Sequence, residues 1–370
     1  MILKNLELTD FKNIESARLD LSPKINCFLG NNGMGKSNLL DALYFMSLCR
    51  SFTGATDSMM VRRGAQFATM RGKYFRRGLD EEVSVVLRPG QRKVFKRSGK
   101  AYQRLAEHLG VFPVVLLSPS DMDLTAGEPA DRRRFIDQII AQRDARYFDA
   151  LVRYNAALEQ RNRLLRDESN DTGLFEALEI QMEMNGSYIA ACRKATVGEL
   201  LEIFTPYFNT IAGGEDHAAM TYSSTDYTDR GGLAGHLAAM RRRDTALGHT
   251  ASGPHRDDIV FTVNDMPVRR SASQGQSKTF TTALRFAQYD LLRKSLGIRP
   301  LLLLDDIFDK LDAGRVERII GLVSSSESFG QIFITDTNRR HLDETVANLR
   351  QSDSYGIWGV ERGVFTSIQA

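Results

Sequence analysis

The sequence has no long apolar run. Its longest apolar stretches are residues 111–117 and 301–304, whereas a membrane-spanning helix needs about 20 consecutive apolar residues. Charged side chains at Glu7 and Asp10 interrupt the start of the chain, so it does not read as a secretory signal peptide. We therefore expect a cytoplasmic protein with no membrane partner.

Cysteine is scarce as well. The 370 residues include three cysteines, Cys27, Cys49 and Cys192, and no C-x-x-C pair. This count and spacing argue against structural disulfides and against a zinc knuckle. Charged residues at 26% and aromatic residues at 9% are ordinary values for globular proteins, which excludes a disordered or fibrous chain. The length predicts two or three domains, at about 150 residues each.

The small net charge hides an uneven distribution. The whole chain carries +3, but residues 62–104 contain 13 basic and 3 acidic side chains. That segment therefore carries +10, and the remaining residues sum to −7. Val83, Val85 and Leu87 alternate with polar residues before a Pro-Gly turn, which predicts that the basic side chains lie on β-hairpins.

Two interpretations of this basic segment stay open. A surplus of this size is typical of salt-sensitive contacts with nucleic-acid phosphates, without base recognition. Alternatively, the charges only balance the acidic remainder of the chain. Residues 241–243 form a second basic patch. The candidate DNA-binding residues are Arg92, Lys93, Lys96 and Arg97.

Hydrophobic periodicity predicts an α/β fold assembled from both ends of the chain. Residues 3–29 have the patterns of three strands, followed by a helix, and strand patterns return at 259, 301–304 and 332–335. Between these parts, apolar residues recur at helical spacing over 135–165 and again over 178–204.

These two helical runs predict an antiparallel helical hairpin, because a polar break at residues 169–173 separates them. We therefore expect a head made of residues 1–120 and 246–370. A short α-helical arm, residues 121–245, is inserted between its halves.

A glycine-rich loop follows the third strand and precedes the helix. It matches G-x-x-x-x-G-K-[ST] in the strand-loop-helix context that this motif requires. Its backbone N–H groups would cradle the phosphates of a nucleotide, Lys36 would neutralise their charge, and the Ser37 hydroxyl would bind Mg²⁺. The loop residues are Gly30, Asn31, Asn32, Gly33, Met34, Gly35, Lys36 and Ser37.

Two carboxylates end the apolar strand 301–304. In a parallel sheet, this is the edge that faces a nucleotide. We expect Asp305 to hold Mg²⁺ through its water shell and Asp306 to orient or deprotonate the attacking water. The predicted catalytic residues are Lys36, Asp305 and Asp306, and the predicted metal-binding residues are Ser37 and Asp305.

A second anion site is predicted 32 residues before Asp305. A hydroxyl and a glycine precede a helical run over residues 278–292, which places a helix N-terminus beside them. Here the sequence resembles the ABC-type ATPases, a class of P-loop NTPases whose serine-glycine motif covers the γ-phosphate held by a partner subunit. Residues 308–312 resemble the D-loop of these proteins, with Asp309 and Asp312 near the dimer interface. The motif consists of Ser273, Gln274, Gly275 and Gln276.

Over essentially the whole chain, the sequence resembles the RecF family of bacterial recombination-mediator ATPases. The arm is too short for the coiled coils of the structural-maintenance ATPases. The matching segments are residues 11–13, 30–37, 119–122, 127–137, 160–165, 252–258, 273–276 and 303–306.

The resemblance implies a weak ATPase that uses ATP and Mg²⁺ and dimerises on ATP. It also implies binding to double-stranded DNA beside single-stranded gaps, and work with RecO and RecR to load RecA in DNA repair, replication restart and the SOS response.

Some family features differ in this chain. A switch histidine is missing where the last core strand ends at residues 334–337, since His341 lies too far along the chain. We assign no Q-loop glutamine near residues 117–121. Asp306 stands where many ABC ATPases have glutamate, which agrees with slow turnover. Two other functions stay open, the ATPase subunit of a membrane transporter and a structural clamp that binds ATP without hydrolysing it.

Overall fold

The computed structural model describes residues 1–214, 216–307, 312–325, 329–337 and 354–368. The chain forms two compact units. We call the first the head, which consists of residues 1–122, 206–215 and 273–370. We call the second the arm, which consists of residues 123–205 and 216–272. No helix in the described parts of the chain is long and apolar enough to span a membrane.

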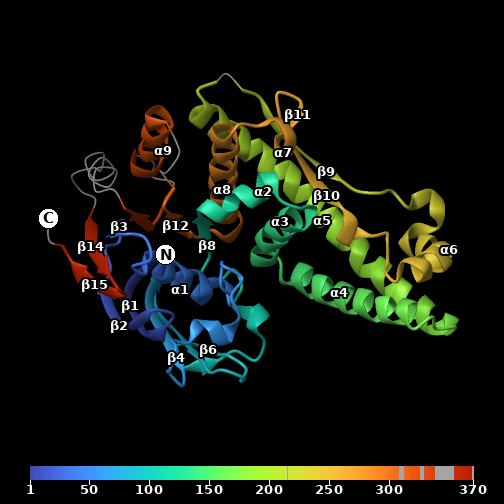
Figure 1. The fold of residues 1–370 in the computed structure, drawn as a ribbon, viewed down its shortest axis with the longest axis horizontal. Helices are drawn as coiled ribbons and strands as arrows, with labels where there is room; N and C mark the ends of the chain where they lie inside the picture. Colours follow the sequence, from blue (N-terminus) through green and yellow to red (C-terminus); the bar gives the residue numbers. More distant parts are fainter. Residues whose placement is uncertain (215, 308–311, 326–328, 338–353, 369–370) are drawn as a thin grey trace. The chain divides into compact units, whose positions relative to one another are not determined.

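The head contains a six-stranded, mostly parallel sheet whose strands come from both ends of the chain (Figure 1). The strand order is β15-β14-β3-β13-β12-β8, and only the β14–β15 pair is antiparallel. β8, β12 and β13 are buried along their whole length, as expected for parallel strands covered on both faces. The strands are β3 (Ile25–Leu29), β8 (Val114–Leu117), β12 (Leu301–Asp305), β13 (Ile332–Asp336), β14 (Tyr355–Glu361) and β15 (Val364–Ser367).

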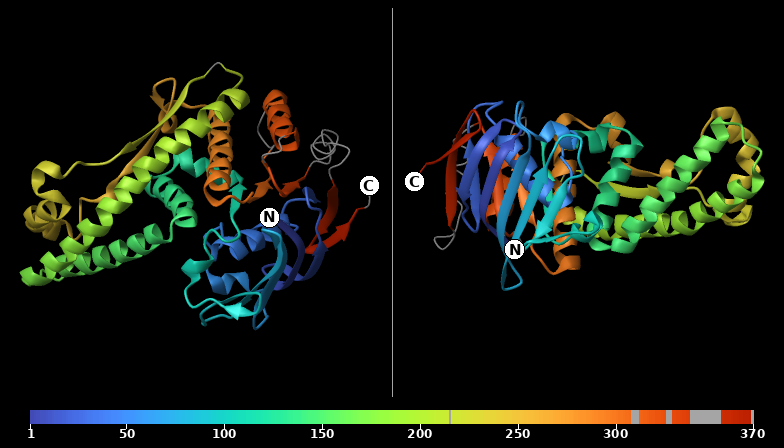
Figure 2. Two further views of the ribbon diagram at one scale, coloured as in Figure 1. Left: turned by 180° about the vertical axis from the view of Figure 1, so that it is seen from behind. Right: turned by 90° about the horizontal axis from the view of Figure 1, so that it is seen from below.

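A second, antiparallel sheet of the head carries most of the basic segment. Its order is β2-β1-β4-β5-β6-β7 (Figure 2). Buried and exposed side chains alternate along β4, so one face packs in the core and the other faces solvent. The predicted β-hairpins are therefore confirmed. The strands are β1 (Ile2–Phe11), β2 (Ile14–Asp20), β4 (Ala68–Arg76), β5 (Leu79–Leu87), β6 (Val94–Arg97) and β7 (Lys100–Ala101).

Longer helices complete the described part of the head. α1 (Lys36–Leu48) contacts β5 of the antiparallel sheet and β8, β12 and β13 of the parallel sheet, so the common core lies around it. α8 (Gln274–Leu296) packs on β8, and α9 (Ala313–Ser325) follows β12. In the part of the chain that the structure describes, the short 3₁₀-helices are η1 (Asp57–Met60), η2 (Leu105–His108), η3 (Pro119–Asp121), η4 (Thr228–Arg230) and η5 (Pro254–Arg256).

The arm is mainly helical, but its first helical run is broken. The apolar pattern predicted one helix over residues 135–165, whereas the structure has α3 (Pro129–Arg143) and α4 (Ala145–Arg166). Asp144 separates them, because its carboxylate accepts hydrogen bonds from the backbone N–H groups of Arg146 and Tyr147 and so starts a new helix.

The predicted antiparallel hairpin is formed by α4 and α5 (Thr172–Ala212). Asp144, before α4, bonds Tyr188 of α5, whereas Arg161 near the end of α4 bonds Glu179 near the start of α5. The remaining arm elements are α2 (Met122–Ala126), β9 (Ala218–Ser223), α6 (Gly232–Leu247), β10 (Asp258–Val263), β11 (Met266–Pro267) and α7 (Val268–Ser271).

The arm extends further along the sequence than the strand pattern suggested. Residues 246–272 were expected in the head, but they belong to the arm. The reason is that β10 pairs along its whole length with β9, from Asp258 opposite Ser223 to Val263 opposite Ala218, in a separate three-stranded sheet.

Basic side chains of the matched arm segments are used in ion pairs within the arm. Arg161 is completely buried and donates to Glu179 (3.1 Å) and Asp244 (2.8 Å). Arg241 of the second basic patch also pairs with Glu179 (2.5 Å). Arg132 pairs with Asp258 (2.8 Å). These arginines therefore connect different elements within the arm.

Removing one partner of a buried ion pair leaves a charge without compensation. We predict that Arg161→Ala lowers the free energy of unfolding by about 3–5 kcal/mol. Arg163→Ala, on the exposed face of the same helix, should change it by less than about 0.5 kcal/mol. Urea denaturation followed by helical circular dichroism measures both. Equal stabilities of the two variants would contradict a stabilising role for Arg161.

Candidate nucleotide-binding site

The glycine-rich loop connects β3 to α1 at the carboxyl edge of the parallel sheet. Gly33 and Gly35 have φ values of 78° and 113°, a left-handed conformation that favours glycine. Gly30 lies so close to β14 that an added Cβ atom would be 2.3 Å from the carbonyl oxygen of Val360. The loop is thus curled as the motif predicts and pressed against the C-terminal hairpin.

Two distant segments support the middle of this loop. The carbonyl oxygen of Met34 accepts hydrogen bonds from the backbone N–H of Gly363 (2.7 Å) and from the side-chain amide of Asn13 (3.4 Å). The Asn38 side-chain amide donates to the side-chain oxygen Oδ1 of Asn13 at 2.8 Å. The sequence had no signal for the contact with Gly363, because it depends on strand pairing at the other end of the chain.

Lys36 points back over the loop. Its ammonium donates to the carbonyl oxygens of Gly30 (2.6 Å) and Asn31 (3.0 Å), and the residue is 6% exposed. Burial lowers the pKa of Lys36, while the nearby carboxylates of Asp306, Asp305 and Asp336 oppose that decrease. A positive charge is thereby held at the centre of the loop, where phosphate groups would need it.

The Asp305 carboxylate is bound by hydroxyl groups from two elements. Its Oδ1 atom accepts hydrogen bonds from Ser37 (2.9 Å) and from Thr335 (2.6 Å). Burial raises the pKa of Asp305, and these two hydrogen bonds, together with the charge on Lys36, counteract the increase. Ser37 and Asp305 were predicted as the metal-binding pair, and the structure brings them into contact.

The oxygen atoms at this point fit a magnesium ion. Mg²⁺ prefers oxygen ligands and is usually held by one or two protein groups together with substrate phosphates and water. Ser37 keeps its lone pairs while it donates to Asp305. Within the described residues, Asp305 Oδ2 accepts no hydrogen bond. The Ser37 hydroxyl oxygen and Asp305 Oδ2 are the groups that would hold the ion and its water.

Asp306 follows at a turn out of β12. Its φ is 48°, an unusual value for a residue other than glycine. The backbone N–H of Asp306 lies 3.2 Å from both the carbonyl oxygen and the hydroxyl oxygen of Thr335. Asp336, the next residue of β13, is 2% exposed. Sequence reasoning predicted Asp306 but missed Thr335 and Asp336, although their strand ends at the same edge of the sheet.

The serine-glycine motif caps α8. Ser273 accepts a hydrogen bond from the backbone N–H of Gln276 (3.1 Å), and the Gln276 side chain accepts one from the N–H of Ser273 (3.0 Å). Ser273 and Gln274 are exposed. An added Cβ on Gly275 would lie 2.7 Å from the guanidinium of Arg315. The motif is therefore a helix N-terminus with exposed polar groups, as predicted.

Of the predicted D-loop, Asp312 lies within the described residues. Residues 308–311, including Asp309, lie outside the described residues, as does His341. Asp312 is exposed and begins α9 by accepting a hydrogen bond from the N–H of Arg315 (3.0 Å). This bond lowers the pKa of Asp312.

Comparisons with known proteins agree with this site and fold. The RecF/RecN/SMC N terminal domain family matches residues 2–357. A DNA replication and repair protein RecF from Parabacteroides distasonis is 47% identical over 364 residues, which cover 98% of each chain. The chain belongs to the RecF family. A second RecF, from Phocaeicola vulgatus, is 44% identical over 369 residues, covering 99% of this chain and 98% of its own.

Solved structures of the RecF family have the same architecture. The recombination mediator protein RecF with ATP, from the RecFOR pathway, has a TM-score of 0.86 at 26% identity and covers 99% of both chains. An Smc head domain derived from Pyrococcus furiosus has a TM-score of 0.57 at 18% identity, covering 99% of this chain and 96% of its own. The expected fold class, an ABC-type head with an inserted helical arm, is confirmed.

The four candidate DNA-binding residues of this RecF-family chain have different surroundings. Lys93 bonds the carbonyl oxygen of Cys49 (2.7 Å) and the carboxylate of Asp57 (3.0 Å). Arg97 pairs with Glu81 (2.5 Å). The two that are exposed, without an ion pair to any described residue, are Arg92 and Lys96.

Other basic residues of segment 62–104 are also paired. Arg62 pairs with Asp10 (2.6 Å), Arg76 pairs with Glu81 (3.0 Å), and Arg71 lies between Glu7 and Glu82. Charge balance therefore accounts for part of the local surplus, as the second interpretation expected.

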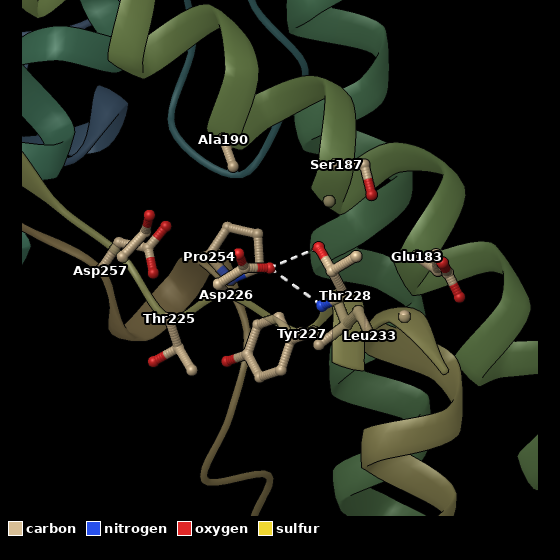
Figure 3. Close-up of a pocket in the computed structure, with 13 residues that line it drawn as sticks. Glu183, Ser187, Ala190, Thr225, Asp226, Tyr227, Thr228, Leu233, Pro254 and Asp257 are labelled. Carbon is tan, nitrogen blue, oxygen red and sulfur yellow. Dashed lines mark hydrogen bonds between the residues drawn. The ribbon is translucent and has the colours of Figure 1, made fainter. Parts of the chain in front are cut away.

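The arm contains a pocket of about 420 Å³ between α5, the start of α6 and the segment after β9 (Figure 3). None of the predicted site residues line it. Its three carboxylates are used locally: Glu183 accepts from the N–H of Ala234, Asp226 from Thr228, and Asp257 from the hydroxyl of Tyr222. Donors from the protein itself thus bind these three carboxylates, so their presence in the pocket does not indicate a ligand.

The contact between Gly30 and Val360 leads to a prediction about the loop. Gly30→Ala places a methyl group against a backbone carbonyl, so the loop must move away from β14. We expect a loss of about 1–3 kcal/mol in stability, the usual cost of overpacking. Gly321→Ala, in α9, meets open space and should stabilise the helix by up to about 1 kcal/mol. Thermal denaturation of both variants measures the difference, and equal melting temperatures would disprove the steric argument.

Proposed function

We propose that this chain is an ATP-dependent DNA-binding recombination mediator. The observation that carries the proposal is the contact of Ser37 with Asp305, which brings the phosphate loop and the acidic strand end together in a member of the RecF family. Relatives named as DNA replication and repair proteins, and a related RecF solved with ATP, support the same function.

ATP would bind with its phosphates in the loop. The N–H groups at the start of α1 face the phosphates, and Lys36 exchanges its loop carbonyl partners for phosphate oxygens. Ser37 and Asp305 would hold Mg²⁺, which would neutralise the charge of the β- and γ-phosphates. The chain itself thus provides donors, one cation and the oxygen ligands.

Hydrolysis would use Asp306. Its carboxylate orients a water molecule and takes a proton as the water oxygen bonds to the γ-phosphorus. The bond between that phosphorus and the β–γ bridging oxygen breaks, and ADP leaves with the electron pair. Aspartate is one methylene shorter than glutamate, which favours a slow ATPase.

Dimerisation would complete the site. At the N-terminus of α8, Ser273 is exposed and Gly275 is half-buried, and the backbone N–H groups of a helix start favour an anion. In the proposed homodimer, this end of α8 covers the γ-phosphate held by the partner. ATP then acts as a ligand of the closed dimer and shifts the equilibrium towards it.

DNA would be held through phosphate contacts. Arg92 and Lys96 are exposed on or beside β6, and the contacts are expected to depend on salt without base recognition. We further propose that the ATP-bound dimer recognises duplex DNA beside single-stranded gaps. There it works with RecO and RecR to load RecA in repair, replication restart and the SOS response, in the cytoplasm.

A larger side chain at position 273 tests ATP binding and dimerisation separately. We predict that Ser273→Arg keeps ATP affinity within about twofold of wild type but abolishes ATP-dependent dimerisation, because the new side chain blocks the anion site. Light scattering after gel filtration with ATP and Mg²⁺ measures the dimer. Ser295→Arg, at the other end of α8, is the matched control and should dimerise normally.

Lys36→Ala should instead impair ATP binding itself. It should lower ATP affinity at least about tenfold, since hydrogen bonds to charged groups contribute roughly 1.5–3 kcal/mol. A Ser273→Arg variant that still dimerises with ATP would rule out capping by a partner subunit.

Reversing one exposed charge tests the DNA surface. Lys96→Glu should weaken binding of a gapped duplex and reduce the slope of log K against log salt by about 0.9 or more, the value for one lost phosphate contact. Arg18→Glu makes the same charge change on β2, at the other edge of the same sheet. Fluorescence anisotropy at several salt concentrations compares them. Equal slopes for Lys96→Glu and wild type would favour charge balance as the role of this segment.

A further inference from the structure

Thr335 contacts both acidic residues of the proposed hydrolytic site. Its hydroxyl donates to Asp305 Oδ1 at 2.6 Å, and the same oxygen lies 3.2 Å from the backbone N–H of Asp306. Its own carbonyl oxygen also accepts from the Asp306 N–H at 3.2 Å. Thr335 is completely buried. A single side chain therefore bridges the two carboxylate-bearing residues.

A hydroxyl group is well suited to this position. It can donate one hydrogen bond and accept others at the same time. Thr335 lies directly opposite Asp305 in the parallel pairing of β12 with β13, so the bridge forms without a rearrangement of either strand. The methyl group of threonine restricts its χ1 angle, which holds the hydroxyl in the bridging direction.

The bridge controls how the Asp305 carboxylate is turned. Two donors, Ser37 and Thr335, bind Oδ1, so rotation of the carboxylate would break both hydrogen bonds in a buried place. The other carboxylate oxygen, Asp305 Oδ2, therefore points away from the hydroxyls of Ser37 and Thr335. Ser37 belongs to the phosphate loop, whereas Thr335 belongs to the sheet, so the carboxylate is held from two independent elements.

The bridge also holds the turn at Asp306. The left-handed φ of 48° at this residue is a conformation that costs energy for a side chain with a Cβ atom. Both oxygens of Thr335 accept from the N–H that this turn presents. The direction in which the Asp306 side chain leaves β12 therefore depends on Thr335.

We propose that Thr335 is a positioning residue for ATP hydrolysis, which orients the Asp305 carboxylate and holds the Asp306 turn through one hydroxyl group. This inference rests on the proposed ATPase function. Thr335 is completely buried, so we expect it to act through the two aspartates and not by direct contact with the nucleotide. Its hydroxyl does the positioning in a chain whose β13 ends without a switch histidine.

The experiment compares Thr335→Val, Thr335→Ser and Thr279→Val with wild type. Valine keeps the shape and β-branching but removes the hydroxyl, and serine keeps the hydroxyl. Thr279 is a buried threonine of α8 whose hydroxyl has no hydrogen-bond partner among the described residues, so its replacement controls for loss of a buried hydroxyl. For each protein, ATP affinity without Mg²⁺, the rate of phosphate release, and the Mg²⁺ concentration for half-maximal rate are measured.

Thr335→Val should bind ATP without Mg²⁺ within about twofold of wild type, because the loop and Lys36 are unchanged. Its kcat should fall roughly 10–100-fold, the usual effect of misplaced catalytic groups, and its Mg²⁺ requirement should rise. Thr335→Ser should recover most of the rate, and Thr279→Val should behave as wild type.

Three results would overturn the inference. One is a Thr335→Val enzyme with the kcat and Mg²⁺ requirement of wild type. Another is a Thr335→Ser variant as impaired as Thr335→Val, which would assign the effect to packing of the methyl group. The third is a parallel loss of ATP affinity, which would indicate a distorted loop. A wild-type protein that neither binds nor hydrolyses ATP would instead refute the proposed function itself.

Discussion

The parallel pairing of β3, β13 and β12 is the constraint on which the proposed site depends. In this register, Phe28 lies opposite Thr335, and Thr335 lies opposite Asp305. The three strands therefore end together, and the residues that follow them meet at one edge. A slip of one residue would turn alternate side chains to the other face of the sheet. The contact between Thr335 and Asp305 therefore requires this register.

The same edge concentrates charge in a buried place. Lys36, Asp305 and Asp336 are 6%, 5% and 2% exposed, and unpaired charges there would be costly. Hydrogen bonds from Ser37 and Thr335 and the proximity of opposite charges reduce that cost. The arm solves the same problem with Arg161 and its two carboxylate partners. Polar networks therefore organise both units, one for proposed chemistry and the other for stability.

Features that depend on local sequence were predicted well. The loop at residues 30–37, the strand end at Asp305 and the helix cap at Ser273 each have a short pattern with a direct physical meaning. The break at Asp144 was missed because the apolar period continues across it, and only the capping hydrogen bonds reveal it. Thr335 has no such pattern, since its importance comes from its partner across the sheet.

Long-range pairing also limited the prediction of charge and of domain boundaries. Lys93 belongs to a strongly basic stretch, yet it binds Asp57, which the sequence places 36 residues away. The strand β10 resembles the strands of the head, but its partner is β9 of the arm. Composition can count charges and strands, whereas only the fold assigns their partners.

The C-terminal hairpin has a consequence for how the protein is made. The turn at Arg362 and Gly363 bonds Met34 of the phosphate loop, across 328 residues for the Arg362 contact, and Val360 lies against Gly30. During synthesis, the loop emerges from the ribosome long before its supporting hairpin exists. Contacts this distant in sequence form late. A nascent chain would therefore present an unsupported loop until residue 363 has left the exit tunnel, so the proposed nucleotide site would be complete only after that point.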